Sequence, residues 1–265
     1  MRLSSVRAVS LGIAAALVTA PGCVSLVDNV VADAISAPAS EVRARSVAEP
    51  MPGDPQTLMT RLRPARAGDR ARAERLARAV ERGIARYRDV EDAVADGYRP
   101  FPPEPDPSMQ VVHYVHTDRS RAEGERGFDP EAPGSLLYER DGRGGWRLLG
   151  AMVTAPVDAT PDELDAAVPL SVTQWHLHQN VCVPRPLWDE AAWARRTPDG
   201  RPVFGPGGPT HTEAACEREG GRFLPTVFGW MAHVHPFARD PADVWNAHYG
   251  HAAGMAPAHD HGGHH

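Results

Sequence analysis

Apolar side chains recur at helical spacing in the segment that begins at Asp69. Leu76, Val80, Ile84 and Tyr87 lie three or four positions apart, with Arg and Glu between them. This is the pattern of an amphipathic helix that buries one stripe of side chains. The sequence therefore predicts a helix at the start of the folded region, with these four side chains buried.

Shorter helices are indicated by their end signals. A helix is predicted from Asp89 to about Gly97, because Gly is favoured just after a helix ends and the Pro-rich run 98–103 cannot continue it. Residues 160–163, Thr-Pro-Asp-Glu, form a capping box with Pro at the first helical position, so a short helix should follow. Another short helix is expected over 210–217, before two glycines.

Beyond residue 108 the pattern changes to the β-branched, alternating composition of strands. Strands are predicted over 109–116, 135–139, 146–154, 172–183 and 228–236. The Gly-rich segment 141–145 has the composition of a hairpin loop between two of them. We therefore expect an α+β fold, with a mainly antiparallel sheet and the N-terminal helix packed on one face.

The N-terminus has the features of an export signal. Arginines at positions 2 and 7 precede an uncharged apolar run, 8–20, which is short for a membrane span and has the size of a signal-peptide core. Small residues then lead to Cys23 and resemble the bacterial lipobox, in which the cysteine is lipidated. The alternative is ordinary cleavage near Ala20 or Gly22. We expect the protein in the periplasm or at the cell surface, anchored to a membrane through Cys23.

Four segments are predicted along the 265 residues. They are a signal peptide with a lipobox-like end (1–23), a flexible linker (24–68), a single α+β domain (69–247) and a His-rich tail (248–265). The linker is assigned because residues 36–68 are rich in Pro, Ala and Arg and show no sustained apolar period.

Charge and motifs exclude several function classes. The net charge is −6 and no basic stripe is present in the predicted domain, so nucleic acid is not the expected partner. The sequence lacks a Gly-x-Ser-x-Gly elbow, a Walker loop, a His-Glu-x-x-His motif and a dinucleotide fingerprint. The commonest enzyme classes therefore have no support, and whether the protein is an enzyme stays open.

Two His-x-His triplets carry the main chemical signal. His176 and His178 lie on one predicted strand, and His233 and His235 on another. Residues two apart in a strand share a face, so up to four imidazoles converge if the strands are neighbours. A lone strand histidine is more often a hydrogen-bonded residue than a ligand, but the repetition favours a site for copper, zinc or another nitrogen-preferring metal.

A third strand offers one further ligand. His113 and His116 are three positions apart, so their side chains point to opposite faces of a strand. We favour His113, because it shares its face with Met109 and Val111 on a largely apolar strand.

The cysteines have two interpretations. Cys182 and Cys216 flank a loop rich in Pro and Gly, and an oxidising compartment favours a disulfide between them. Alternatively, Cys182, four residues after His178, is a thiolate ligand in a mixed His/Cys site.

The C-terminal tail is a second candidate metal binder. Clustered, flexible histidines capture copper, nickel and zinc at moderate affinity. The alternative is a solvated tail in which the histidines are incidental. The tail ligands proposed from the sequence are His259, His261, His264 and His265.

Two sequence blocks, Trp-His-Leu-His-Gln-Asn-Val-Cys at 175–182 and Gly-Trp-Met-Ala-His-Val-His-Pro at 229–236, resemble an uncharacterised family of exported bacterial proteins. The resemblance covers roughly residues 75–247. It implies that these segments form one domain, and it implies no activity.

The function most favoured by these patterns is an extracytoplasmic metal-binding protein for buffering, sensing or delivering copper or zinc. Its expected partners are the metal ion and a membrane, and any protein partner is unknown. One alternative is a metal-dependent enzyme, with Glu139 or Asp189 as candidate acid/base groups. Another is a disulfide-stabilised interaction domain without metal.

Overall fold

A computed structural model describes residues 36–37, 43–103, 109–247 and 249. In these ranges, no helix has both the length and the apolar character needed to cross a membrane. Some sequence predictions lie outside the described residues: the signal segment, and the side chains of Cys23, His259, His261, His264 and His265.

One antiparallel sheet organises the described part of the chain. Its strand order is β2-β3-β8-β9-β7-β6-β5-β4, and β1 pairs separately with β9. The α+β prediction is confirmed. The strands are β1 (Ser36–Ala37), β2 (Ala48–Met51), β3 (Asp54–Thr60), β4 (Arg99–Phe101), β5 (Val111–Val115), β6 (Ser135–Arg140), β7 (Trp146–Ala155), β8 (His176–Pro184) and β9 (Gly221–Val234).

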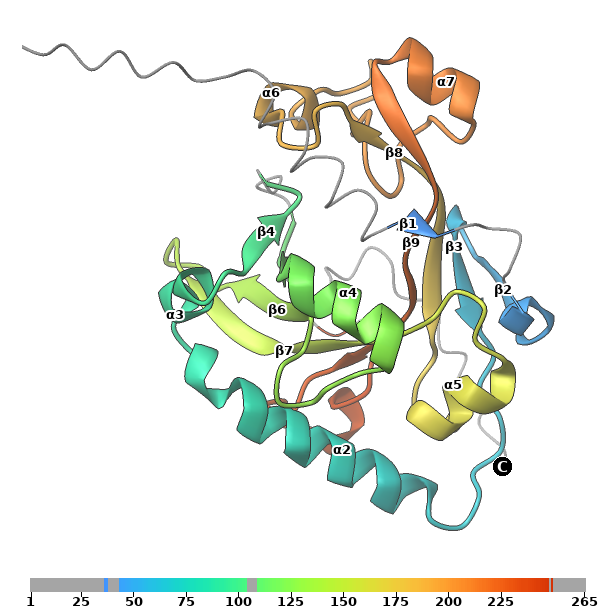
Figure 1. Ribbon diagram of the computed structural model, residues 1–265, viewed down its shortest axis with the longest axis vertical. Helices are drawn as coiled ribbons and strands as arrows, with labels where there is room; N and C mark the ends of the chain where they lie inside the picture. Colours follow the sequence, from blue (N-terminus) through green and yellow to red (C-terminus); the bar gives the residue numbers. More distant parts are fainter. Residues whose placement is uncertain (1–35, 38–42, 104–108, 248, 250–265) are drawn as a thin grey trace, which may run out of the picture.

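Helices cover the sheet unevenly. Figure 1 shows α2 along the lower side of the molecule, whereas β8 and β9 rise to α6 and α7 at the top. The described helices are η2 (Arg43–Val47), α2 (Asp69–Ile84), η3 (Ala85–Tyr87), α3 (Val90–Ala95), α4 (Thr117–Arg126), α5 (Pro161–Ala167), α6 (Glu190–Trp193), α7 (Glu213–Arg218) and η4 (Pro241–Asp243).

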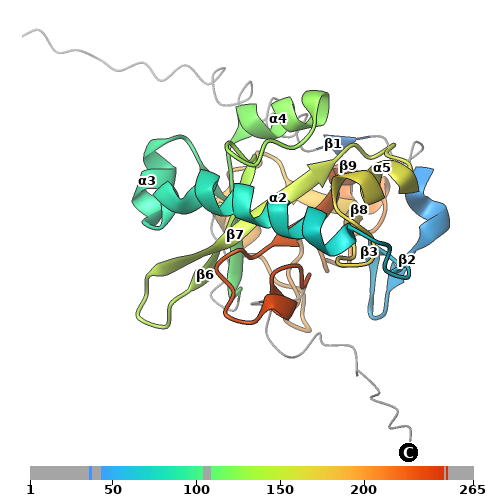
Figure 2. The same ribbon diagram turned by 90° about the horizontal axis from the view of Figure 1, so that it is seen from below.

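The predicted N-terminal helix is α2. Val80, Ile84 and Tyr87 are buried, and Leu76 is partly buried against the same core. The helix packs on the sheet face that carries Ala151 and the other inward residues of β7. Seen from below, α2 crosses the sheet as one continuous helix with α3 at one end (Figure 2).

The local helix signals are confirmed. Asp89 caps α3 by accepting from the backbone N–H of Glu91, and Thr212 caps α7 in the same way. Thr160 and Glu163 form the reciprocal capping box at the start of α5. Each of these signals is read from residues within one helical turn, so no tertiary contact is needed to interpret it.

The predicted flexible linker is wrong for the part of residues 24–68 that forms β2 and β3. Leu58 is buried, and β3 pairs with β8 along the register Thr57–His178 and Met59–His176. The segment was mistaken for a linker because its strand is short, follows a Pro-rich stretch, and is completed by hydrogen bonds to a strand far along the chain. The folded region therefore begins before the predicted boundary at Asp69.

Two predicted strands have different limits. β8 begins at His176, not at 172, and β9 begins at Gly221, not at 228. β9 is irregular in its middle: His178 pairs with Val227, whereas His176, only two positions away, pairs with Met231. The extra residues in β9 form a bulge, and a bulge bends its strand. The bulge includes Phe228 and Gly229, whose φ angles are 60° and 83°.

The sheet is strongly curled. The ring centroids of His113 on β5 and His233 on β9 lie 5.3 Å apart, although β6 and β7 lie between these strands. Neighbouring strands are about 4.7–4.9 Å apart, so a flat sheet would separate β5 and β9 by roughly 14 Å. The face that carries these histidines is therefore concave, and residues of distant strands meet across it.

Glycine allows the neighbouring strands β7 and β9 to approach each other closely at one position. A Cβ built on Gly150 of β7 would lie 1.8 Å from the carbonyl oxygen of Val234 on β9. No side chain fits there, so the tight contact between the two strands requires Gly at this position.

Candidate functional site

Histidines from three strands gather on the concave face. The ring of His233 on β9 is central: its centroid lies 4.9 Å from that of His176 on β8 and 5.3 Å from that of His113 on β5. His178 lies next to His176, and the centroids of these two rings are 5.4 Å apart. With metal–nitrogen bonds of about 2.0–2.1 Å, two imidazoles on one tetrahedral ion have centroids roughly 5 Å apart. The spacing of the central pairs is thus that of co-ligands.

The predicted site residues differ in their positions. His113, His176, His178 and His233 all line one cavity. His235 is fully buried beyond it, 6.0 Å from His233 and 4.9 Å from Tyr249 between ring centroids. In the described part of the chain, no three His, Cys, Asp or Glu side chains are placed so that they could hold one metal ion. The rings are close neighbours that would have to rotate to share an ion.

His116 has a different place from His113. It stands at the N-cap of α4, where its Nδ1 accepts from the backbone N–H of Arg119 at 3.5 Å. Its ring meets that of Tyr98 edge-on, with centroids 5.3 Å apart. Burial lowers the pKa of His116 below its usual range. The His116 side chain therefore caps α4 and packs against Tyr98, and it is not part of the histidine group on the concave face.

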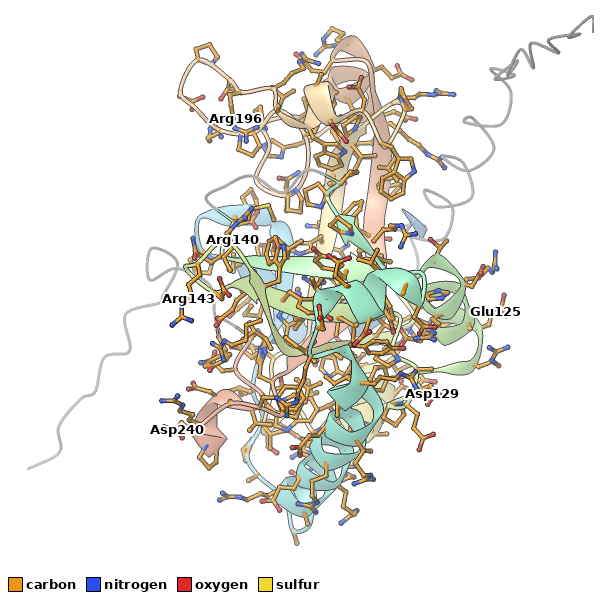
Figure 3. The ribbon with its side chains drawn as sticks, turned by 90° about the vertical axis from the view of Figure 1, so that its left-hand side faces the viewer. Glu125, Asp129, Arg140, Arg143, Arg196 and Asp240 are labelled. Atoms are coloured by element: carbon orange, nitrogen blue, oxygen red, sulfur yellow. A yellow bond between two sulfur atoms is a disulfide. The ribbon has the colours of Figure 1, made fainter. Side chains whose placement is uncertain are left out.

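The cavity beside the histidines has a volume of about 770 Å³. Its apolar wall comes from Phe101, Trp193, Phe204 and Phe228. The ring of Phe101 meets those of Trp193 and Phe228 edge-on. Charged groups lie on the same lining, among them Arg196. Arg196 and Arg140 lie on the same side of the molecule, whereas Glu125 and Asp129 lie on the opposite side (Figure 3).

His178 is held by a relay of polar groups. The hydroxyl of Thr57 donates to Asp54 Oδ2 at 2.6 Å, and the same oxygen lies 2.9 Å from His178 Nδ1. Because Thr57 has a single hydroxyl proton, its oxygen accepts a hydrogen bond from Nδ1–H of His178. The relay therefore places the proton on Nδ1 and the lone pair of the neutral ring on Nε2, which is the form that a metal ligand needs.

His113 has a similar support. Its Nδ1 lies 3.2 Å from the hydroxyl oxygen of Ser135, the first residue of β6. The residue before it, Gly134, donates its backbone N–H to Glu123 Oε1 at 2.7 Å, and Thr154 donates to Glu123 Oε2 at 2.6 Å. Burial raises the pKa of Glu123 to about 7. A buried carboxyl group thus fixes the backbone next to the residue that orients His113.

The two cysteines form a disulfide. The Cα atoms of Cys182 and Cys216 lie 5.5 Å apart, and the sulfur atoms are bonded at 2.00 Å. This confirms the predicted bridge and excludes the alternative in which Cys182 is a thiolate ligand. The backbone N–H of Gly205, on the cavity wall, donates to the Cys182 carbonyl at 2.7 Å, so this hydrogen bond ties the wall to β8 at the position of the disulfide.

The candidate acid/base groups lie elsewhere. Glu139 forms an ion pair with Arg147 on the neighbouring strand, and Asp189 caps α6 by accepting from the N–H of Ala192. Neither side chain lines the cavity. The structure gives neither residue a role beside the histidines.

Sequence reasoning missed the methionines of the concave face. Met59 and Met231 are the Cα partners of His176 on its two sides, and Met152 is the partner of His233. Met51 and Met109 line the cavity. The sequence signals were Met109, which shares a strand face with His113, and Met231, which stands two positions before His233 and so shares its face.

The chain stands apart in comparisons with known proteins: no protein-family model, no curated protein and no solved structure matches it. The function has to be argued from the site.

Proposed function

We propose that this is an exported metal-binding protein that holds one copper or zinc ion on the concave face of its sheet, for buffering, sensing or delivery. His113, His176 and His233 are the proposed ligands, with His178 as a fourth. The observation that carries the proposal is the spacing of the rings around His233, 4.9 Å to His176 and 5.3 Å to His113, because imidazoles that share a tetrahedral ion have this separation.

The surroundings of the rings support the same function. Metal-bound histidines usually donate their second ring nitrogen to an oxygen, which fixes ring orientation and tautomer. His178 donates to the Thr57 hydroxyl oxygen in this way, and the Ser135 hydroxyl is the hydrogen-bond partner of His113 Nδ1. Hydroxyl partners at two rings from different strands would orient these rings once they have turned toward a shared ion.

The export signal, the lipidation of Cys23 and the His-rich tail belong to the proposal. A flexible tail of histidines can collect metal from solution, and an anchor keeps the protein at a membrane surface. We propose that the tail collects the ion and that the concave face holds it.

A metal titration tests the site. The protein without residues 251–265, purified without a histidine-affinity step, should bind one equivalent of Zn²⁺ or Cu²⁺ per chain. The His176→Ala/His233→Ala double variant should lose that equivalent. The matched control is His116→Asn, which removes an imidazole but keeps a good N-cap residue for α4. Equal stoichiometry and affinity in the double variant and the parent protein would leave a disulfide-stabilised domain whose concave face binds no metal.

A second function, a metal-dependent enzyme, is favoured by the cavity. Its volume of about 770 Å³ lies within the usual range for small-molecule sites, and three histidine ligands leave a coordination position open. The Co²⁺-loaded protein should then change its visible spectrum when azide is added, since azide enters an open position. An unchanged spectrum would support storage or delivery instead.

A further inference from the structure

Two methionines flank His176 on the concave face. In the sheet, Met59 on β3 and Met231 on β9 are the Cα partners of His176 on β8, one on each side. Directly paired residues of antiparallel strands share a face, and their Cβ atoms are about 4.5–5.5 Å apart. Met59, His176 and Met231 therefore form one row across three neighbouring strands.

The next row repeats the pairing. His233 lies two residues beyond Met231 on β9, so it is on the same face. Its Cα partner on β7 is Met152, which is fully buried. Each of the two central histidines thus has at least one methionine as a direct cross-strand neighbour.

All the described methionines belong to this part of the molecule. The chain has 7 methionines. Of those in the described residues, four line the cavity and the fifth is the cross-strand partner of His233: Met51, Met59, Met109, Met231 and Met152. A thioether on three rotatable bonds can turn its sulfur toward a point that the imidazoles also reach.

We propose that the ion is copper in its cuprous state, held by His176 and His233 together with the thioether sulfurs of Met59 and Met231. The inference rests on the proposed metal-binding function; it names the metal, and for the cuprous ion the two thioethers take the places that the proposed function gives to His113 and His178. Thioether sulfur is a soft ligand that selects Cu(I), whereas Zn²⁺ is bound by thiolate, imidazole and carboxylate.

Charge favours the same oxidation state. The four proposed ligands are neutral, so the charge of the loaded site is the charge of the ion. His176, His233 and Met231 are 6%, 3% and 1% exposed, and burying a charge in such a place is costly without compensation. A monovalent ion is therefore easier to accommodate than a divalent ion on these ligands.

Competition titration tests the inference. The protein without residues 251–265 is titrated with Cu(I) against a chromophoric chelator under ascorbate and without oxygen, and separately with Zn²⁺. The variant is Met59→Leu/Met231→Leu, which keeps side-chain volume nearly constant. The matched control is Met51→Leu/Met109→Leu, which changes two cavity methionines that are not partners of His176.

We expect the Met59→Leu/Met231→Leu variant to lose roughly tenfold or more of its Cu(I) affinity, as expected when a metal loses part of its coordination environment. Its Zn²⁺ affinity should stay close to that of the parent protein, and the control should bind both ions normally. X-ray absorption of the Cu(I)-loaded parent protein, which requires no variant, should show sulfur as well as nitrogen around copper.

Unchanged Cu(I) affinity in the variant, or an absorption spectrum with nitrogen ligands alone, would overturn the cuprous assignment. The proposed metal site would still stand if His176→Ala/His233→Ala abolished binding of either ion. If that double variant bound both ions like the parent protein, the site itself would be wrong, so the two failures are distinguishable.

Discussion

The hydroxyl oxygen of Thr57 lies 2.9 Å from Nδ1 of His178, and the two residues face each other as partners in β3 and β8. Removing the hydroxyl in Thr57→Val leaves the ring without the group that fixes its tautomer. We expect metal affinity to fall about 10–100-fold, the usual cost of losing such an outer partner. Isothermal titration calorimetry with Zn²⁺ on the protein without residues 251–265 measures this loss of affinity.

The matched control for this prediction is Thr173→Val. Thr173 is also buried. Whereas Thr57→Val removes two hydrogen bonds, Thr173→Val removes one, from the Thr173 hydroxyl to the Trp245 carbonyl. It should lower the free energy of unfolding by about 1 kcal/mol and leave metal affinity unchanged. Equal loss of affinity in both variants would show that Thr57 acts through general stability.

The buried carboxyl of Glu123 predicts a pH-dependent stability. Its pKa is raised from 4.5 to about 7, chiefly by burial, with a smaller rise from the Asp129 carboxylate. Between these values the folded protein keeps a proton that the unfolded chain releases, so the free energy of unfolding should fall as pH rises from about 5 to 8. Each pKa unit corresponds to about 1.4 kcal/mol, so the change is at most about 3 kcal/mol.

The Glu123→Gln variant should remove most of that slope, because the amide stays neutral at every pH. Urea unfolding at pH 5, 6, 7 and 8 compares it with Glu125→Gln, an exposed position on the same helix that should keep the parent slope. A Glu123→Gln variant that keeps the pH dependence of the parent protein would contradict the raised pKa.

The disulfide should account for a substantial part of the stability. Cys182 and Cys216 are 34 positions apart. Closing a loop of that length lowers the conformational entropy of the unfolded chain, which raises the free energy of unfolding by about 3–4 kcal/mol at 25 °C. The Cys182→Ser/Cys216→Ser variant should unfold at a correspondingly lower urea concentration, and reduced parent protein should behave like it. Two free thiols in the unreduced parent protein would show that the bridge does not form.

The proposed lipidation of Cys23 predicts a change of location. Cys23→Ser should move the protein from the membrane fraction to the soluble fraction, because the buried acyl methylenes supply the membrane affinity at about 0.8 kcal/mol each. Fractionation together with intact mass measures the effect. A variant that stays in the membrane fraction without an acyl mass would require a different anchor.

The sequence predicted the fold where local signals are sufficient. The apolar stripe of α2 and the capping box formed by Thr160 and Glu163 can each be recognised from residues close together in the sequence, and the structure contains both. β3 was missed because its pairing with β2 is irregular, with a register shift between Pro50 and Met51, and its other neighbour, β8, lies far along the chain. A run of seven residues with Pro at its second position does not indicate such pairing by its own composition.

The site could be predicted in part. The His-x-His spacing correctly puts His176 and His178 on a single strand, and residues of both triplets line one cavity. The methionine rows could not be foreseen, because they depend on register, and the bulge between Val227 and Met231 alters the register where it matters. The approach of His113 to His233 depends on sheet curvature, which no residue pattern in β5 reveals.

The pairing of β3 with β8 determines the stage of folding at which the proposed metal site can form. Thr57 and His178 are 121 positions apart, and His233 comes later still. In an extended chain that crosses a membrane, these groups are far apart and cannot share one ion. Long-range strand pairing is also slow compared with helix formation. The ion would therefore be acquired only after the last strand has joined the sheet, in the compartment where the protein folds.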